Sequence, residues 1–518
     1  MPNSSNDPLY LLVKSLSKSE KRNFKLFVNR LQSNEDSKFL VLFDILDKLH
    51  DYHEEKIFQK APDISKTQLS NLKAHLYKQI LQSLRMNASN QDLDIYLREQ
   101  IDYAKLLYNK GLYTQSLKIL DKAGSSAIEF EKNAILLEII DFEKHIESQY
   151  ITRSIDTTAE ELTQNAIELN KKIAGSNVFS NLGLRLYSLY LKTSHIRNEK
   201  DYLFVSEFFK SNLPAYNIDE LSFFEKLYLY QSYVWYNYII QDFLTCYKYA
   251  NKWVDLFKEN SHLIPVYADL YLKGLHNLMA ALFFINHKAK FSSTLQTLVE
   301  LGKEEFISNN ENNSVLLFQY LFINKINYHF MNGNFSGGLY LVDDIEEGLK
   351  RFDKKIDDNR ILNFYYKIGC LYFGSGDNEN AIKYLNKVIN HPVQIRGDIQ
   401  SFTRILKLIA HYEKGDAEMV EYQVKSVYRF LYKLQELNQV QQHIINFLRK
   451  VPSMDAKSVK SEFIRLRFNL IKLQQDPYEK RAFLYLDIIS WLTCKIENRS
   501  IQEVIREKAM NKSRLLHE

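Results

Sequence analysis

Turn-forming residues are scarce in this chain, because only 15 of its 518 residues are glycine and only 8 are proline. An average protein contains about 7% glycine and about 5% proline, more than twice as much of each. Folds built on a β-sheet need turns rich in glycine or proline about every dozen residues, whereas paired helices need only a short loop between them. The shortage therefore favours an all-α fold.

Cysteine and long apolar runs are scarce as well. Cys246, Cys370 and Cys494 lie far apart and form no CxxC pair, which predicts isolated thiols in a reducing compartment. The longest apolar run, residues 278–285, is much shorter than the roughly 20 residues of a membrane-spanning helix. The first residues lack the basic and then apolar segments of a secretory signal. We therefore expect a cytoplasmic protein without a membrane span.

A strong charge of one sign is also absent, since the formal net charge is +5 at pH 7. Non-specific nucleic-acid binding by the whole chain is therefore not expected. The motifs of phosphate-binding loops, dinucleotide folds, zinc proteases and serine hydrolases do not occur. We expect no catalytic residues, no cofactor and no metal site, and so a protein that is not an enzyme. An enzyme with an unfamiliar site is the remaining alternative.

Apolar residues are plentiful, at 45% of the chain, and they recur at helical spacing. Leu9 and Leu16 fall on one face of a first helix, and the S-x-x-E pattern of Ser17 and Glu20 is typical of a capping box that starts the next one. Similar amphipathic stretches continue to about residue 90. They predict a small helical N-terminal domain over residues 1–90.

From about residue 91, short loop signals recur between amphipathic stretches. The last five of these signals are about 39 to 48 residues apart, which predicts a helical repeat. A less distinct loop is expected near residues 153–157. The clearer signals begin at Lys110, Gln241, Ala289, Gly333, Gly376 and Gly415.

The clearest repeat extends over residues 365–392. A large residue, an aliphatic residue, a small residue and a tyrosine come first, and a small residue and two apolar ones follow the loop: Tyr365, Ile368, Gly369, Tyr372, then Gly376 and Asp377, then Ala381, Leu385 and Val388. This pattern resembles the tetratricopeptide repeat, although most units here exceed its 34 residues. The resemblance implies an all-α, right-handed superhelical solenoid of antiparallel helix pairs over residues 91–450, with helical capping over residues 451–518.

The resemblance also implies a concave groove that binds a protein or peptide partner. Rigid aromatic side chains and asparagines suit that task, because rings bury much area at low entropic cost and amides bond a backbone. The alternative is that these side chains simply pack between repeats. The family positions that line the groove fall on Tyr228, Trp235, Tyr238, Tyr320, Asn327, Phe330, Asn363, Tyr366 and Cys370.

Residues 14–30 form the sharpest basic segment, with six basic residues against one acidic residue. A solvated helix surface and a phosphate-binding surface both fit this pattern. We expect a non-enzymatic protein- or peptide-binding scaffold. The alternative is a transcriptional or nucleic-acid-binding regulator that uses the basic helices, with the solenoid as its sensor. The candidate phosphate contacts are Lys18, Lys21, Arg22 and Lys25.

Overall fold

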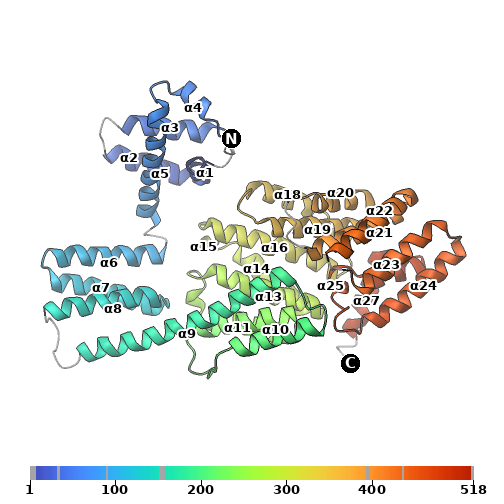
Figure 1. The fold of residues 1–518 in the computed structure, drawn as a ribbon. Helices are drawn as coiled ribbons and strands as arrows, with labels where there is room; N and C mark the ends of the chain where they lie inside the picture. The colour runs from blue at the N-terminus through green and yellow to red at the C-terminus, as the bar shows by residue number, and fades with distance from the viewer. Residues whose placement is uncertain are drawn as a thin grey trace. The chain divides into compact units, whose positions relative to one another are not determined.

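The computed structural model describes residues 7–31, 36–88, 92–150, 158–392, 397–434 and 437–514 (Figure 1). Within these ranges the chain forms α-helices, two short 3-10 helices and loops, and it contains no strand. The predicted all-α class is therefore confirmed. In the same ranges, no helix combines the length and the apolar character needed to cross a membrane. The loop expected near residues 153–157 lies outside the described residues.

The chain divides into two compact units, Met1–Asn170 and Lys171–Glu518. The finer division into residues 1–90, 91–450 and 451–518 stays a prediction. One helix, α9 (Thr158–Thr193), begins in the first unit and ends in the second.

The first unit begins with five helices around one apolar cluster, in which Leu42, Leu46 and Leu76 are fully buried. The predicted capping box is confirmed: the Ser17 amide donates to Glu20 Oε2 at 2.7 Å, and the Glu20 amide donates to Ser17 Oγ at 3.2 Å. This pairing satisfies two backbone donors that a helix start leaves open. The five helices are α1 (Pro8–Ser15), α2 (Lys18–Leu31), α3 (Asp36–Lys48), α4 (Glu54–Lys60) and α5 (Lys66–Ala88).

Three further helices of the first unit pack on one another in sequence order around a second apolar cluster. Gly111 has a φ of +72°, a conformation that glycine adopts at no steric cost, and it forms the turn between the first two. These helices are α6 (Leu93–Asn109), α7 (Tyr113–Glu129) and α8 (Asn133–Gln149).

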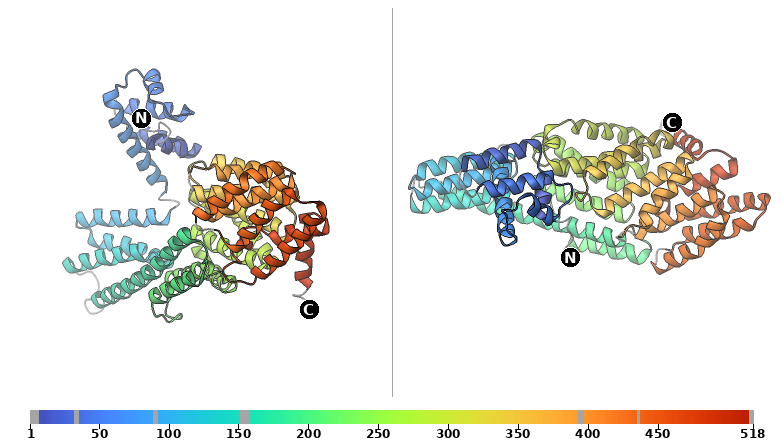
Figure 2. Two further views of the ribbon diagram at one scale, coloured as in Figure 1. Left: turned by 45° about the vertical axis from the view of Figure 1, so that its right-hand side comes forward. Right: turned by 90° about the horizontal axis from the view of Figure 1, so that it is seen from above.

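The second unit continues with helices that also pack on their sequence neighbours. Figure 2 shows them side by side with short connections in two further views. They are α10 (Glu199–Asn212), α11 (Phe223–Ile239), α12 (Phe243–Glu259), α13 (Ala268–Ile285), α14 (Lys288–Leu301), α15 (Glu305–Ser308), α16 (Glu311–Met331), α17 (Phe335–Gly338), α18 (Leu341–Arg351), α19 (Asp358–Ser375), α20 (Asn378–Ile389), α21 (Gly397–Glu413) and α22 (Ala417–Lys433).

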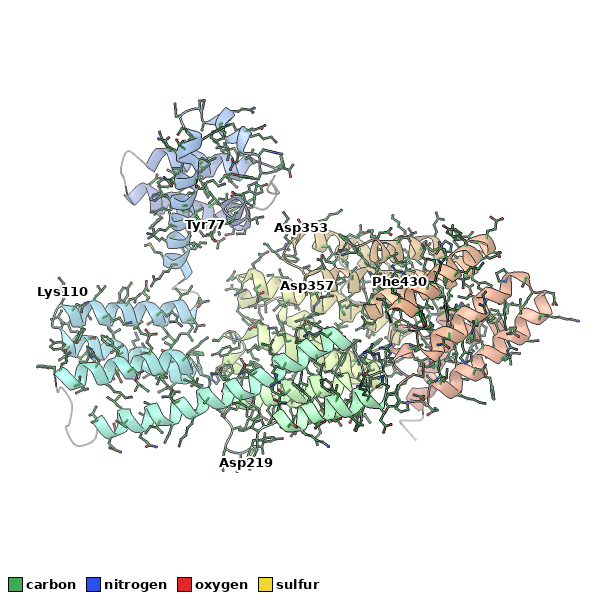
Figure 3. The ribbon with its side chains drawn as sticks, viewed as in Figure 1. Tyr77, Lys110, Asp219, Asp353, Asp357 and Phe430 are labelled. Carbon is green, nitrogen blue, oxygen red and sulfur yellow. The ribbon has the colours of Figure 1, made fainter. Side chains whose placement is uncertain are left out.

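The pair α19 and α20 is the helical hairpin that the repeat at residues 365–392 predicts. Asp357, labelled in Figure 3, starts α19 by accepting the Arg360 amide at 3.2 Å, and Gly376 ends it with a φ of +91°. A side chain added at Gly369 would lie 2.8 Å from Leu385 Cδ2. The glycine therefore lets the two helices pack closely.

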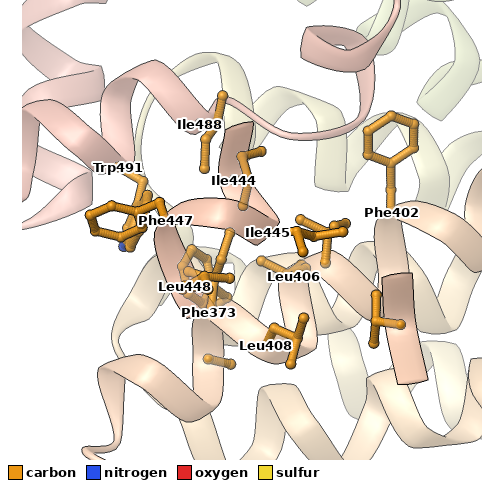
Figure 4. Packing of buried hydrophobic residues seen from close by; sticks show 14 of the residues in the cluster. Phe373, Phe402, Leu406, Leu408, Ile444, Ile445, Phe447, Leu448, Ile488 and Trp491 are labelled. Carbon is orange, nitrogen blue, oxygen red and sulfur yellow. The ribbon is translucent and has the colours of Figure 1, made fainter. Parts of the chain in front are cut away.

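Helices that are not neighbours in sequence also contact one another: α13 packs on α16, α16 on α19, and α19 on α21. The chain then adds five more helices, of which α26 packs on α24 and α27, and α27 packs on α19. Trp491, Phe447 and Leu406 belong to the apolar cluster that joins these last helices to α19 and α21 (Figure 4). The five are α23 (Gln439–Lys450), α24 (Ala456–Leu473), α25 (Ala482–Tyr485), α26 (Ile488–Glu497) and α27 (Ile501–Arg514).

Candidate functional site

A cavity of about 450 Å³ lies inside the second unit, and we call it the inner cavity. Its walls come from α9, α11, α13, α16, α19 and α21, and from a later segment, residues 474–509. The lining residues include Tyr190, His195, Tyr238, His276, Phe283, Phe284, Asn327, Phe330, Asn363, Tyr366, Lys367, Cys370, Phe373, Leu406, Phe483, Leu486, Asp487, Trp491, Ile501, Ile505 and Lys508.

Three helices, α13, α16 and α19, each present one face to the inner cavity, because their lining residues are mostly three or four positions apart. On α19 that face includes Asn363, Lys367 and Cys370. On α16, Asn327 and Phe330 occupy the corresponding face, whereas α9 and α11 contribute a single residue each. The helical spacing thus directs side chains of α13, α16 and α19 toward one cavity.

One end of the inner cavity is aromatic. The ring of Tyr238 lies 5.4 Å from that of Tyr190 and 5.9 Å from that of Phe284, measured between centroids. His195 Nδ1 lies 2.8 Å from the carbonyl oxygen of Tyr238, which fixes the imidazole beside these rings. Tilted ring pairs of this kind add about 0.5–1.5 kcal/mol each beyond the area that they bury. This end is therefore a rigid apolar wall.

The centre of the inner cavity contains a lysine with neutral neighbours. Lys367 Nζ donates to Asn327 Oδ1 at 2.7 Å and lies 5.6 Å from the ring centroid of Phe283 and 5.5 Å from that of Phe330. Burial lowers the pKa of Lys367 to about 8, and the nearby Cys370 thiol opposes that shift. Among the described residues, no carboxylate forms an ion pair with Lys367. The lysine is therefore a half-buried positive charge held by an amide and two rings.

Four other titratable groups of the inner cavity, His276, Cys370, Asp487 and Lys508, are uncharged near neutral pH or paired with each other. Burial lowers the pKa of His276 to about 3, with Arg360 and Lys367 adding to the effect. Burial raises the pKa of Cys370 to about 12, although Lys367 opposes this. Of the described lining residues, Asp487 is the single carboxylate, and Lys508 Nζ donates to it at 2.9 Å. These four groups thus bring no unpaired charge into the inner cavity near neutral pH.

The last described helix closes one side of the inner cavity. Gln502 Nε2 donates to Ser336 Oγ at 2.9 Å, and the Ser336 amide donates to Gln502 Oε1 at 3.1 Å. Arg506 Nε donates to the carbonyl oxygen of Gly333 at 3.1 Å. Ile501 and Ile505 face the space beneath. These contacts hold α27 against α17 and the loop that precedes it, so that α27 covers one side of the inner cavity.

Six of the nine groove residues expected from sequence line the inner cavity: Tyr238, Asn327, Phe330, Asn363, Tyr366 and Cys370. Tyr228, Trp235 and Tyr320 do not. Tyr320 is 3% exposed and stacks under the His276 ring at 4.3 Å. The Trp235 ring packs between those of Tyr187 and Tyr190, and the Tyr228 ring stacks on that of Phe224. Tyr320 and Trp235 thus pack on neighbouring helices and Tyr228 stacks along its own helix, α11. A binding role for the nine residues stays a prediction.

Sequence reasoning missed Lys367 and His276. A signal for Lys367 does exist, because it lies four residues after Asn363 and thus on the same helical face. His276 lies on the cavity face of α13, in a unit where the repeat pattern is weak. Neither residue occupies one of the positions by which the groove was predicted.

The basic segment of the first unit is partly neutralised. Lys21 Nζ lies 2.7 Å from Asp47 Oδ1, and Lys25 Nζ lies 2.7 Å from Asp44 Oδ1. Lys18 and Arg22 have exposed side chains on α2. Two of the four candidate phosphate contacts therefore already have acidic partners within the unit.

The chain matches no family model, no curated protein and no solved structure. The tetratricopeptide resemblance thus has no confirmation from a family match. The three cysteines are free thiols. Among the described residues, no group of three or more His, Cys, Asp or Glu side chains is placed to hold a metal ion.

Proposed function

We propose that this chain is a non-enzymatic scaffold that binds a segment of a partner protein in the inner cavity. Its helix pairs would form a right-handed solenoid akin to tetratricopeptide repeats. The observation that carries the proposal is that side chains from several helices of the second unit face the inner cavity. A cavity lined in this way is suited to contacting several side chains of one bound segment.

The chemistry of the lining supports a peptide as the ligand. Aromatic rings such as Tyr238 and Phe330 offer large, rigid contact areas, and the amides of Asn327 and Asn363 can bond a peptide backbone. His276 is uncharged and Cys370 is protonated near neutral pH, so neither is ready to act as a general acid or a nucleophile. The protonation states of these two residues therefore favour binding over catalysis.

The test is affinity co-purification of the tagged protein from its own cells, with and without nuclease, read by mass spectrometry. A variant with Tyr238→Ala and Asn363→Ala should lose a stoichiometric protein partner that wild type retains. The matched control is Tyr422→Ala with Tyr432→Ala, because these side chains are 81% and 71% exposed on α22. Equal melting temperatures would show that both variants are folded.

Two results would count against this function. A partner retained by the cavity variant would place its binding surface elsewhere. Partners lost only after nuclease treatment would favour the alternative, a transcriptional or nucleic-acid-binding regulator that contacts phosphates through Lys18 and Arg22. A gel shift that weakens steeply with added salt would then support that alternative.

A further inference from the structure

We infer that the inner cavity contains a subsite for an anionic group at Lys367, and that the bound segment carries a carboxylate side chain next to a bulky apolar one. The class of partner inferred here rests on the proposed function. The anionic subsite itself can be tested without any peptide.

The first argument is the missing counter-charge. Lys367 Nζ has a neutral partner, the Asn327 amide oxygen at 2.7 Å. Even partial burial of an ammonium group without an anion is unfavourable, because it removes part of the water that stabilised the charge, and Lys367 is half-buried. A ligand carboxylate at this position would supply the missing charge.

Two other nitrogen groups of the lining do not compete for this role. The His276 imidazole is uncharged at neutral pH because its pKa is lowered by burial. Lys508, the second lysine of the inner cavity, is paired with Asp487 and lies 3.5 Å from Ser490 Oγ. Of these three groups, Lys367 is the one whose charge is left for a ligand.

The second argument is what surrounds the ammonium group. The ring centroids of Phe283 and Phe330 lie 5.6 Å and 5.5 Å from Lys367 Nζ, within the range of cation–π attraction. These rings hold the lysine in place and form apolar walls beside the anionic subsite. A ligand that fills the space must then place an apolar group next to its carboxylate.

The third argument is size. The inner cavity, at about 450 Å³, falls within the range of roughly 300–1,000 Å³ that small-ligand pockets occupy. It can hold a few side chains, not a long helix. The ligand is thus a short acidic and apolar segment.

The subsite is tested with two fluorescent probes of matched shape. The anionic one is 1-anilinonaphthalene-8-sulfonate, and the uncharged one is N-phenyl-1-naphthylamine. The variants are Lys367→Met, Lys367→Arg and a control, Lys325→Met. Lys325 lies on α16, which packs on α19, but it does not line the inner cavity. Its Nζ lies 5.1 Å from the ring centroid of Phe322.

Lys367→Met removes the proposed ion pair between the lysine and the sulfonate group of the probe. The Kd of this probe should therefore rise about 10-fold or more. The uncharged probe should bind wild type and Lys367→Met alike, which also shows that the variant is folded. Lys367→Arg should keep most of the sulfonate affinity, and Lys325→Met should keep all of it. Equal sulfonate affinity in wild type and Lys367→Met would overturn the inference.

The peptide arm uses two pools of hexapeptides, acetylated and amidated at their ends, with aromatic and aliphatic residues around either one Glu or one Gln. Wild type should retain the Glu pool over the Gln pool, and Lys367→Met should show no preference. Equal retention of both pools by wild type would remove the anionic subsite and leave the proposed function. If the probes behave as expected and neither pool binds, the proposed function fails and the subsite stands.

Discussion

The lysines of the first helices and the lysine of the inner cavity have opposite surroundings. Lys21 and Lys25 each lie 2.7 Å from a carboxylate oxygen, and Lys73 contacts the carboxylate of Asp7. Lys367 is half-buried and has an amide and two rings as neighbours. The paired lysines stabilise the helical unit to which they belong, whereas we propose that the charge of Lys367 is matched by a ligand.

The comparison implies that the first helices contribute stability and no part of the inner cavity. Phe43 is fully buried there, and its ring centroid lies 4.8 Å from that of Phe24. Phe43→Ala should lower the free energy of unfolding by about 3–5 kcal/mol, because the cavity left behind cannot fully close. Chemical denaturation followed by circular dichroism measures this change. If folded Phe43→Ala bound the uncharged naphthylamine probe more weakly than wild type, the first helices would contribute to the inner cavity after all.

A smaller loss is expected where two helices of the second unit pack closely. Gly369→Leu should cost about 1–3 kcal/mol, since its side chain would collide with Leu385. Gly124→Ala is the control, because the added methyl group would meet its neighbours at 3.8 Å, an ordinary contact. The control should raise stability by about 0.5–1 kcal/mol, as alanine does within a helix. Melting temperatures that order the two variants otherwise would refute the packing described for α19 and α20.

Because Lys367 is half-buried without an acidic partner, it should make the free energy of unfolding depend on pH. The pKa of Lys367 is about 8 in the folded protein and 10.5 without burial. Between these values the unfolded chain binds more protons, so wild type gains stability as pH rises. Relative to Lys367→Met, the gain between pH 7 and pH 10 should be on the order of 2–3 kcal/mol. Denaturation of both proteins at both pH values measures it, because other titrations cancel in the difference. If the two proteins differed by the same free energy of unfolding at pH 7 and pH 10, the lowered pKa of Lys367 would be contradicted.

The smallest effect is expected for a paired surface lysine. Lys21→Ala removes the ion pair with Asp47, whose side chain is 31% exposed, and should cost about 0.2–1 kcal/mol. The cost should shrink in high salt, where exposed charges are screened. Unfolding in low and high salt measures both numbers. A loss above about 2 kcal/mol would mean that this pair is more than a surface contact.

The sequence could predict features that depend on neighbouring residues. Ser17 with Glu20 predicted a helix start, and Gly376 with Asp377 predicted the turn of a hairpin, because caps and turns are determined within a few residues. The cavity face of α19 was partly predictable too, since the tetratricopeptide resemblance implied Asn363, Tyr366 and Cys370 as groove residues, and these residues line the inner cavity.

The role of Lys367 could not be predicted in the same way. Whether a lysine is paired depends on which acids lie near it in space, and here residues 474–509, far away in the chain, form one wall. The same reason explains Tyr320, which was expected in the groove and is covered by His276. Rotation of a helix by a fraction of a turn decides between lining and packing, and a repeat pattern does not fix that rotation.

The tryptophans give this protein its own optical reporter. Only three are present in the chain. Trp491 lines the inner cavity, with its indole donating to Glu413 at 2.7 Å, and Trp235 packs on Tyr190 at the aromatic end. Trp253 is 1% exposed among core residues and should emit a constant background. Filling of the cavity should therefore change the emission of an unlabelled sample, so that occupancy can be followed without attaching a dye.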